Sequence, residues 1–169
     1  MSTEIEKILK TAQKNKEKVV AISQTVLVEP NLMDDIFSAI LHGSSTEKGN
    51  CIEALEHVSQ IQPGLVLPYL DSVIENILND LPRVRREACR EIANMAPHFP
   101  EYLVSSIPNL MINTRHKGIV VRWSAARALT EIYKHKPEVN HLLAEFERIL
   151  KDEKNQGVRK IYLNALDQK

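Results

Sequence analysis

The chain has 169 residues, a length typical of one domain. Its 22 Lys and Arg residues balance 22 Asp and Glu residues, and this zero formal charge disfavours a protein that binds polyanions over its whole surface. Aromatic residues make up only 5% of the chain and glycine occurs five times, which indicates an aliphatic core and argues against an all-β fold. No apolar run reaches the ~18 residues that span a bilayer, and no secretory signal is visible, so we expect a cytoplasmic protein without a membrane partner.

Taken in chain order, apolar residues at helical spacing and short polar turns predict five helix pairs and no strand. The expected pairs are residues 3–28, 31–62, 64–97, 101–136 and 138–169. Helix starts have their own signals, because Thr3 with Glu6 and Ser44 with Glu47 have the spacing of capping boxes.

Three Val-Arg pairs recur at intervals of 37 residues, and so do three prolines that separate the pairs of helices. These residues are Val84-Arg85, Val121-Arg122 and Val158-Arg159, with Pro63, Pro100 and Pro137. Independent positions that share one period indicate a repeat protein. The sequence therefore predicts a single all-α solenoid domain over 1–169, with an N-terminal capping pair at 1–30 and four repeats of about 37 residues at 31–169.

The unit at 64–97 has a proline early in its first helix, an acidic turn and a Val-Arg pair that opens the second helix: Pro68, Asp80 and Val84-Arg85. Later units repeat parts of this pattern with Pro108, Val121-Arg122, Asp152 and Val158-Arg159. Over residues 64–169 the pattern resembles that of HEAT repeats, which are armadillo-like. The resemblance implies a right-handed α-α superhelix whose second helices line a concave, partner-binding face. It also implies that Arg85, Arg122 and Arg159 pair with acidic turn residues and serve structure.

The second helices carry a candidate partner-binding stripe opposite their apolar positions. In the third unit this stripe comprises Arg83, Arg86, Glu87, Arg90 and Asn94, and the 37-residue offset extends it to later helices. The candidate binding residues are Arg86, Arg90, Trp123, Arg127 and Lys160. Tryptophan supplies apolar area and a stacking face, while arginine supplies bidentate pairing with carboxylate or phosphate. In the alternative interpretation Trp123 packs between helices, and the arginines pair with Glu87, Glu91 and Glu131.

Charge is unevenly distributed along the chain. Residues 29–62 hold six acidic residues and one basic residue, whereas residues 100–136 hold six basic and two acidic residues. This distribution suits a partner with complementary halves or head-to-tail self-association. The cluster Arg115, His116 and Lys117 favours an anionic partner at the basic unit. Ile161 falls on the side expected to face solvent, where it would cover an open end or mediate self-association.

The leading functional hypothesis is a non-catalytic scaffold or adaptor that binds a protein or peptide, including one with an acidic segment. The alternative is a nucleic-acid-binding protein, in which basic residues of the stripe contact phosphates and Trp123 stacks on a base. The resemblance to the HEAT-like alkylpurine DNA glycosylases is poor. Those enzymes use a basic face with several aromatic residues and an acid near the lesion, and here Arg127 stands one turn after the single tryptophan.

An enzyme or chromophore lyase of the HEAT-like type is a third class. It would need a convergent polar site, and the sequence has no glycine-rich phosphate loop, His-Glu-x-x-His motif or nucleophile elbow. The six histidines fit no metal-ligand spacing, and Cys51 and Cys89 are interpreted as small buried thiols that stay reduced. We therefore predict no catalytic residue, cofactor or metal.

Overall fold

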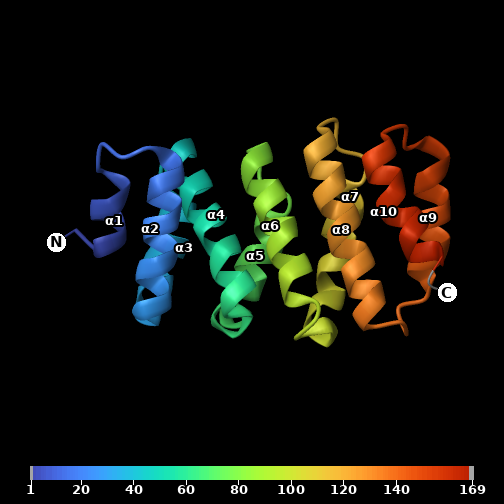
Figure 1. Cartoon of the computed structure of the whole chain (residues 1–169), viewed down its shortest axis with the longest axis horizontal. Helices are drawn as coiled ribbons and strands as arrows, with labels where there is room; N and C mark the ends of the chain where they lie inside the picture. Colours follow the sequence, from blue (N-terminus) through green and yellow to red (C-terminus); the bar gives the residue numbers. More distant parts are fainter. Residues whose placement is uncertain (1, 168–169) are drawn as a thin grey trace. The chain divides into compact units, whose positions relative to one another are not determined.

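The computed structural model describes residues 2–167, and in this part of the chain every regular element is a helix (Figure 1). The chain divides into two compact units, one up to Ser72 and one from Val73 onwards, and each is described by itself. The prediction of a single domain over 1–169 stays a prediction. No helix among the described residues is long and apolar enough to cross a membrane.

The first unit contains two helix pairs, as the sequence predicts. Its elements are α1 (Glu4–Leu9), α2 (Asn15–Val28), the 3-10 helix η1 (Pro30–Leu32), α3 (Met33–His42), α4 (Ser45–Ile61), the 3-10 helices η2 (Pro63–Leu65) and η3 (Leu67–Tyr69), and the start of α5 (Leu70–Asn76). Helix α2 packs against α4, and α3 also packs against α4. The core of this unit is aliphatic and includes Ile5, Ile22, Ile36 and Leu55, all of which are fully buried.

Both predicted capping boxes are confirmed. The Thr3 hydroxyl accepts a hydrogen bond from the Glu6 amide at 3.2 Å, and the Thr3 amide donates to the Glu6 carboxylate at 3.1 Å. Ser44 and Glu47 make the same reciprocal pair at 3.3 and 2.8 Å. These bonds satisfy amide donors that the first turn of a helix leaves without an intrahelical partner. The hydrogen bonds from the Ser44 amide and hydroxyl also lower the pKa of Glu47.

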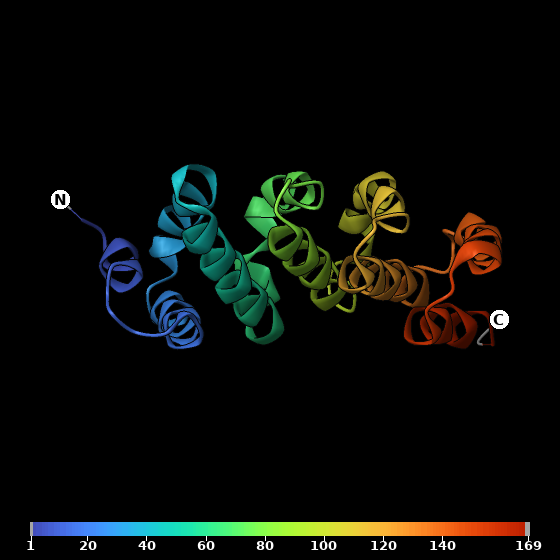
Figure 2. The ribbon, with the colours of Figure 1, turned by 90° about the horizontal axis from the view of Figure 1, so that it is seen from above.

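The second unit contains the remaining repeats. Its elements are the end of α5, then α6 (Pro82–Met95), the 3-10 helix η4 (Pro100–Ser106), α7 (Ile107–Asn113), α8 (Ile119–His135), α9 (His141–Asp152) and α10 (Gln156–Asp167). Helix α8 packs against α6 on one side and against α10 on the other. Seen from above, α6, α8 and α10 run along one side of this unit, and α7 and α9 lie along the other (Figure 2). The predicted second helices therefore form one layer.

The first helices of two repeats differ in detail from the prediction. The sequence predicts helices that start near residues 64 and 101, but 3-10 segments occupy these stretches before α5 and α7 begin. Prolines account for the difference, because a proline is tolerated in the first turn of a helix but breaks its interior. Pro63 and Pro100 are the first residues of η2 and η4, and Pro68 is the second residue of η3. Each of these repeats thus begins with 3-10 structure, followed by a first helix and a longer second helix.

The 37-residue period reappears as equivalent buried positions on α6, α8 and α10. Val84, Val121 and Val158 are all buried, and Ala88 and Ala125 are fully buried. The corresponding position of α10 holds Tyr162, whose ring lies 5.2 Å from that of Phe146 on α9. In the last helix pair, the larger Tyr162 side chain packs against Phe146 at the position where the two earlier repeats have alanine.

Candidate functional site

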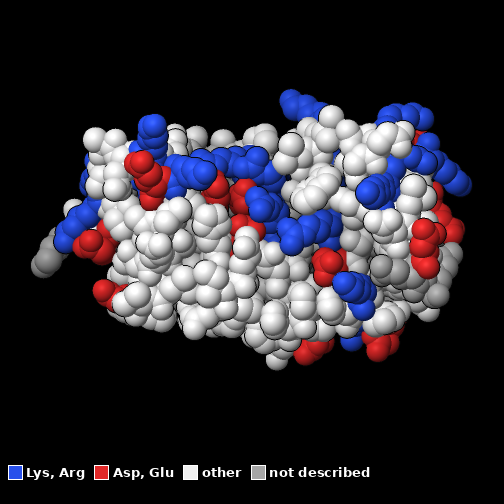
Figure 3. All heavy atoms as spheres, in the orientation of Figure 1, with Lys and Arg blue, Asp and Glu red and all other residues white. Residues whose placement is uncertain are grey.

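The candidate binding residues lie on the three neighbouring helices α6, α8 and α10. Trp123 on α8 is 38% exposed. Arg86 and Arg90 belong to α6, whereas Arg127 follows Trp123 by one turn of α8 and Lys160 lies on α10. Figure 3 shows Lys and Arg side chains over α6, α8 and α10. We call the surface formed by Arg86, Arg90, Trp123, Arg127 and Lys160 the second-helix face.

The α6 end of this face is organised around a buried carboxylate. The side chain of Glu87 is fully buried, and the Arg86 Nε atom lies 3.0 Å from its Oε1 atom. Arg90 donates to both Glu87 oxygens at 3.5 Å. The prediction that Glu87 lies on the solvent side is therefore wrong. The structure bears out the alternative for this acid, because both arginines pair with it.

The burial of Glu87 follows from the environment of α6 as a whole. Its buried positions extend well beyond the apolar stripe and are Val84, Glu87, Ala88, Cys89, Glu91, Ile92, Ala93 and Met95. A helix with neighbours on more than one side buries polar positions that an amphipathic pattern assigns to solvent. A buried carboxylate needs a charged or hydrogen-bonding partner, and the arginines supply it here.

Arg127 links α8 to α6 on this face. Its guanidinium donates to the Asn94 side-chain oxygen at 3.3 Å. The predicted alternative partner, Glu131, instead lies 3.3 Å from His135 on its own helix. Because a guanidinium has five N–H donors, the bond to Asn94 leaves Arg127 with donors for a ligand.

The first turn of α8 adds apolar residues that the sequence analysis missed. Ile119 and Val120 are 49% and 53% exposed, and they precede Trp123 by four and three residues. This spacing places all three side chains on one side of the helix. The sequence offered one sign of this patch, because Ile119 and Val120 are aliphatic residues at the start of α8 that fall outside its inward-facing positions. Together with Trp123 they form an exposed apolar patch on α8, the middle helix of the second-helix face.

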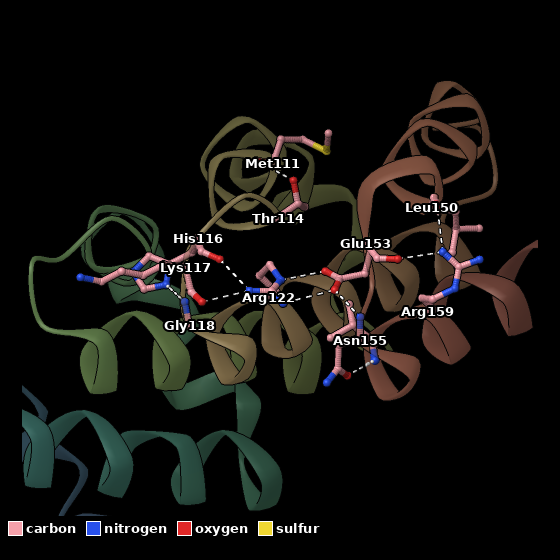
Figure 4. Close-up of polar contacts among 11 residues, drawn as sticks. Met111, Thr114, His116, Lys117, Gly118, Arg122, Leu150, Glu153, Asn155 and Arg159 are labelled. Carbon is pink, nitrogen blue, oxygen red and sulfur yellow. Dashed lines mark hydrogen bonds and ion pairs between the residues drawn. The ribbon is translucent and has the colours of Figure 1, made fainter.

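The three repeated arginines serve structure, as predicted. Arg85 donates to the carbonyls of Leu78 and Asn79 at 3.2 and 2.9 Å, and Arg159 donates to those of Leu150 and Glu153 at 2.6 and 2.8 Å. Each guanidinium therefore caps the turn that precedes its own helix. The carboxylate partner that the resemblance implies is present for Arg122, which pairs with Glu153 (Figure 4).

The pair of Arg122 and Glu153 is bidentate. The two Arg122–Glu153 nitrogen–oxygen distances are 2.8 and 3.2 Å, and a third Arg122 nitrogen donates to the carbonyls of His116 and Lys117. Burial acts to raise the pKa of Glu153, but the hydrogen bonds from Arg122 and from the Asn155 amide outweigh it and hold that pKa below its ordinary value. The ion pair therefore joins the start of α8 to the turn between α9 and α10.

The cysteines are buried free thiols, as predicted. Burial raises the pKa of Cys51 and of Cys89 to about 12, which keeps both side chains protonated. Among residues 2–167, no group of three His, Cys, Asp or Glu side chains is placed to hold a metal ion. Ile161, which was expected to face solvent, is half-buried and lines a cavity of about 200 Å³ beside Arg127 and Tyr133.

Comparisons with known proteins relate the chain to others by fold. No protein-family model matches the chain, and no curated protein matches it either. A solved structure of computationally designed armadillo repeat proteins for modular peptide recognition matches it with a TM-score of 0.75 at 18% identity, over 96% of this chain and 79% of that chain. A designed armadillo repeat protein in complex with the peptide (KR)4 matches with a TM-score of 0.74 at 19% identity, over 96% and 79%.

An engineered protein gives a third structural match, with a TM-score of 0.73 at 16% identity over 97% of this chain and 80% of that chain. At these identities the similarity concerns the fold, and it agrees with the helix pairs and the 37-residue period described above. The chain therefore has the fold of an armadillo-like α-helical repeat protein.

Proposed function

We propose that this protein is a non-catalytic scaffold that binds an extended peptide or protein segment on the second-helix face. The observation that carries the proposal is the exposed apolar patch of Ile119, Val120 and Trp123 on α8, between basic residues of α6 and α10. A partner that covers an exposed tryptophan buries a large apolar surface, which favours binding. Tryptophan and arginine are also enriched among the residues that dominate binding energy at protein interfaces. The structural neighbours support this class of function, because two of them are designed for or bound to peptides.

The charges of the face favour a segment that alternates acidic and apolar residues. Lys160 forms no ion pair within the described part of the chain, and Arg127 keeps donors beyond its bond to Asn94. The neighbour in complex with (KR)4 holds a basic peptide, whereas the basic side chains of the second-helix face favour the opposite sign. Exposed ion pairs contribute only ~0–1 kcal/mol each, so the apolar patch supplies affinity and the charges supply selectivity.

The test is the binding of a fluorescein-labelled (Glu-Leu)4 peptide, measured by anisotropy on the full chain. We expect saturable binding that is weakened about tenfold by Trp123→Ala and by Arg127→Glu, with (Lys-Leu)4 binding more weakly than (Glu-Leu)4. The matched control is Lys151→Glu, which makes a similar charge reversal at an exposed site on α9. Equal affinities of all variants for the acidic peptide would rule out the second-helix face as the binding surface.

The same variants test the nucleic-acid alternative with a labelled oligo(dT) strand. A protein that contacts phosphates loses affinity steeply as salt rises, with a log–log slope proportional to the number of contacts. Tight, salt-sensitive binding of oligo(dT) that Trp123→Ala abolishes, together with no binding of (Glu-Leu)4, would replace the peptide-scaffold proposal with this alternative.

A further inference from the structure

A second candidate site lies in the second unit, beside the turns that precede α8 and α10. None of its residues belongs to the second-helix face. A cavity of about 400 Å³ opens between the ends of α7 and α9. Figure 4 shows the Arg122–Glu153 pair, which lines this cavity, below Met111 and Thr114 at the end of α7, with Leu150 of α9 to its right. We call this cavity the turn pocket. Its volume falls within the range of sites that hold small organic ligands.

The walls of the turn pocket are strongly charged. Five cationic side chains and three carboxylates line it, namely Arg115, Lys117, Arg122, Arg148 and Lys154, with Glu145, Asp152 and Glu153. Two of the cations are neutralised within the pocket, because Arg122 pairs with Glu153 and Arg148 pairs with Glu145 at 2.6 Å. The lining as a whole carries a net charge of +2 when His116 is neutral.

The positive charge that remains comes from two different turns. Arg115 and Lys117 belong to the turn between α7 and α8, and Lys154 belongs to the turn between α9 and α10. Within residues 2–167 these three side chains form no ion pair and no side-chain hydrogen bond, and all three are exposed. Asp152 is the one lining carboxylate left to oppose them. An anion in the pocket would therefore meet cations from both turns.

His116 also lines the turn pocket, and its hydrogen bond fixes the tautomer of the neutral ring. Its Nδ1 atom accepts a hydrogen bond from the Gly118 amide at 2.9 Å, so the neutral ring carries its proton on Nε2. Burial lowers the pKa of His116, and the nearby charges of Arg85 and Lys117 lower it further. The imidazole thus lies in positive surroundings and presents an N–H donor at neutral pH. Met111 and Ile149 provide apolar surface in the same cavity.

We propose that the turn pocket binds a phosphate monoester dianion, with its phosphate among Arg115, Lys117 and Lys154 and its organic group against Met111 and Ile149. The charge of a dianion matches the net charge of the lining, whereas a single carboxylate leaves half of that charge unbalanced. Phosphate oxygens accept charge-assisted hydrogen bonds from both lysine and arginine. The pocket is also larger than a bare phosphate requires, which leaves room for the group that the phosphate esterifies. This site is independent of the proposed peptide-binding function.

Calorimetric titration of the full chain with phenyl phosphate tests the proposal, and backbone amide NMR spectra locate the site. We expect saturable binding with shifts at residues 115–118 and 154, and an affinity for benzoate about tenfold weaker, since benzoate offers one charge instead of two. The double variant Lys117→Gln/Lys154→Gln should bind phenyl phosphate about tenfold more weakly than the original chain. Both lysines are exposed, so this variant keeps the fold.

The matched control is Lys134→Gln/Lys151→Gln, which removes the same charge from α8 and α9 outside the pocket lining. It should change the affinity for phenyl phosphate by less than about twofold, because neither lysine lines the pocket and solvent and salt screen exposed charges. An absence of saturable binding by phenyl phosphate, an equal affinity for benzoate, or an equal loss in the control variant would each overturn the proposal.

One further ligand identifies the source of the phosphate. A short phosphotyrosine peptide that binds more tightly than phenyl phosphate would indicate a phosphorylated side chain of a partner. Binding of phenyl phosphate with exclusion of that peptide would indicate a small phosphate ester. Both results require a phosphate monoester in the turn pocket, and they differ only in what carries it.

Discussion

Arg122 and Glu153, which are 31 residues apart in the chain, form a bidentate ion pair that joins the start of α8 to the turn before α10. Glu153 is buried, and it also accepts a hydrogen bond from the Asn155 amide at 2.9 Å. The Arg122 guanidinium also donates hydrogen bonds to the carbonyls of His116 and Lys117. One side chain therefore links the turns before α8 and α10, which belong to consecutive repeats, and supports one wall of the turn pocket.

Replacement of Arg122 by Ala should lower the free energy of unfolding by about 2 kcal/mol, because it leaves a buried carboxylate without its charged partner. Arg122→Lys should recover only part of this loss, since an ammonium lacks the planar fork that bonds both carboxylate oxygens. Urea unfolding followed by circular dichroism measures both values. A double-mutant cycle with Glu153→Gln should give a coupling energy of about 1 kcal/mol or more. Additive effects of the two changes would contradict the link.

The pKa values of Glu47 and Glu153 lie below the ordinary value for glutamate and predict how stability depends on pH. The unfolded chain protonates these groups at the ordinary value, so between the two pKa values the unfolded state binds more protons than the folded state. Their contribution is therefore complete above the ordinary pKa and is lost as pH falls through the lowered folded pKa. Urea unfolding at about pH 6 and about pH 3.5 should show the loss, with a smaller change in Glu153→Gln. An identical pH dependence in that variant would refute the assignment.

The contact between Tyr69 and Asp34 should stabilise the first unit. The Tyr69 hydroxyl donates to the Asp34 carboxylate at 2.6 Å, and this bond is the main reason that the pKa of Tyr69 rises to about 12. The Tyr69 ring also stacks on Phe37, with centroids 4.6 Å apart. Tyr69→Phe removes the hydrogen bond but keeps the stack, and it should cost about 1 kcal/mol of unfolding free energy. Tyr69→Ala removes both contacts and should cost more, so equal losses in the two variants would indicate that the hydroxyl alone matters.

Cys51 and Cys89 should resist alkylation in the folded protein. Only the thiolate reacts, and the pKa of about 12 for each buried thiol leaves a very small thiolate fraction at neutral pH. Intact-mass spectrometry after treatment with iodoacetamide should show an unmodified native chain and two modifications in denaturant. Rapid modification of the native chain at either residue would show that its thiol is more accessible than its burial implies.

Local features of the fold were predictable because they depend on residues close in sequence. The capping boxes at Thr3 and Ser44 each need a glutamate three residues later, and both form as predicted. The 37-residue period of the Val-Arg pairs likewise anticipated the equivalent helices α6, α8 and α10. The prolines were correctly interpreted as breaks between helix pairs, but the 3-10 segments that begin at Pro63 and Pro100 were not predicted.

The polar positions of the second helices were less predictable. Glu87 and Arg86 are adjacent in sequence, yet one is fully buried and the other is half-exposed. The apolar pattern of α6 predicts one buried face. Which of its side chains are actually buried also depends on the elements that pack around the helix. The exposure of Ile119 and Val120 is the opposite case, in which aliphatic residues at the start of α8 are left uncovered.

The sequence by itself determined the helical repeats, their caps and the arginines that close their turns, because these features rest on periodicity and on hydrogen bonds between nearby residues. Only the tertiary structure decided which charges meet. Arg122 reaches Glu153 across 31 residues, and Lys154 lines the same cavity as Arg115 and Lys117 from a separate turn. The physical reason is that burial and ion pairing depend on how neighbouring helices pack against one another, and a linear period carries no information about those distances.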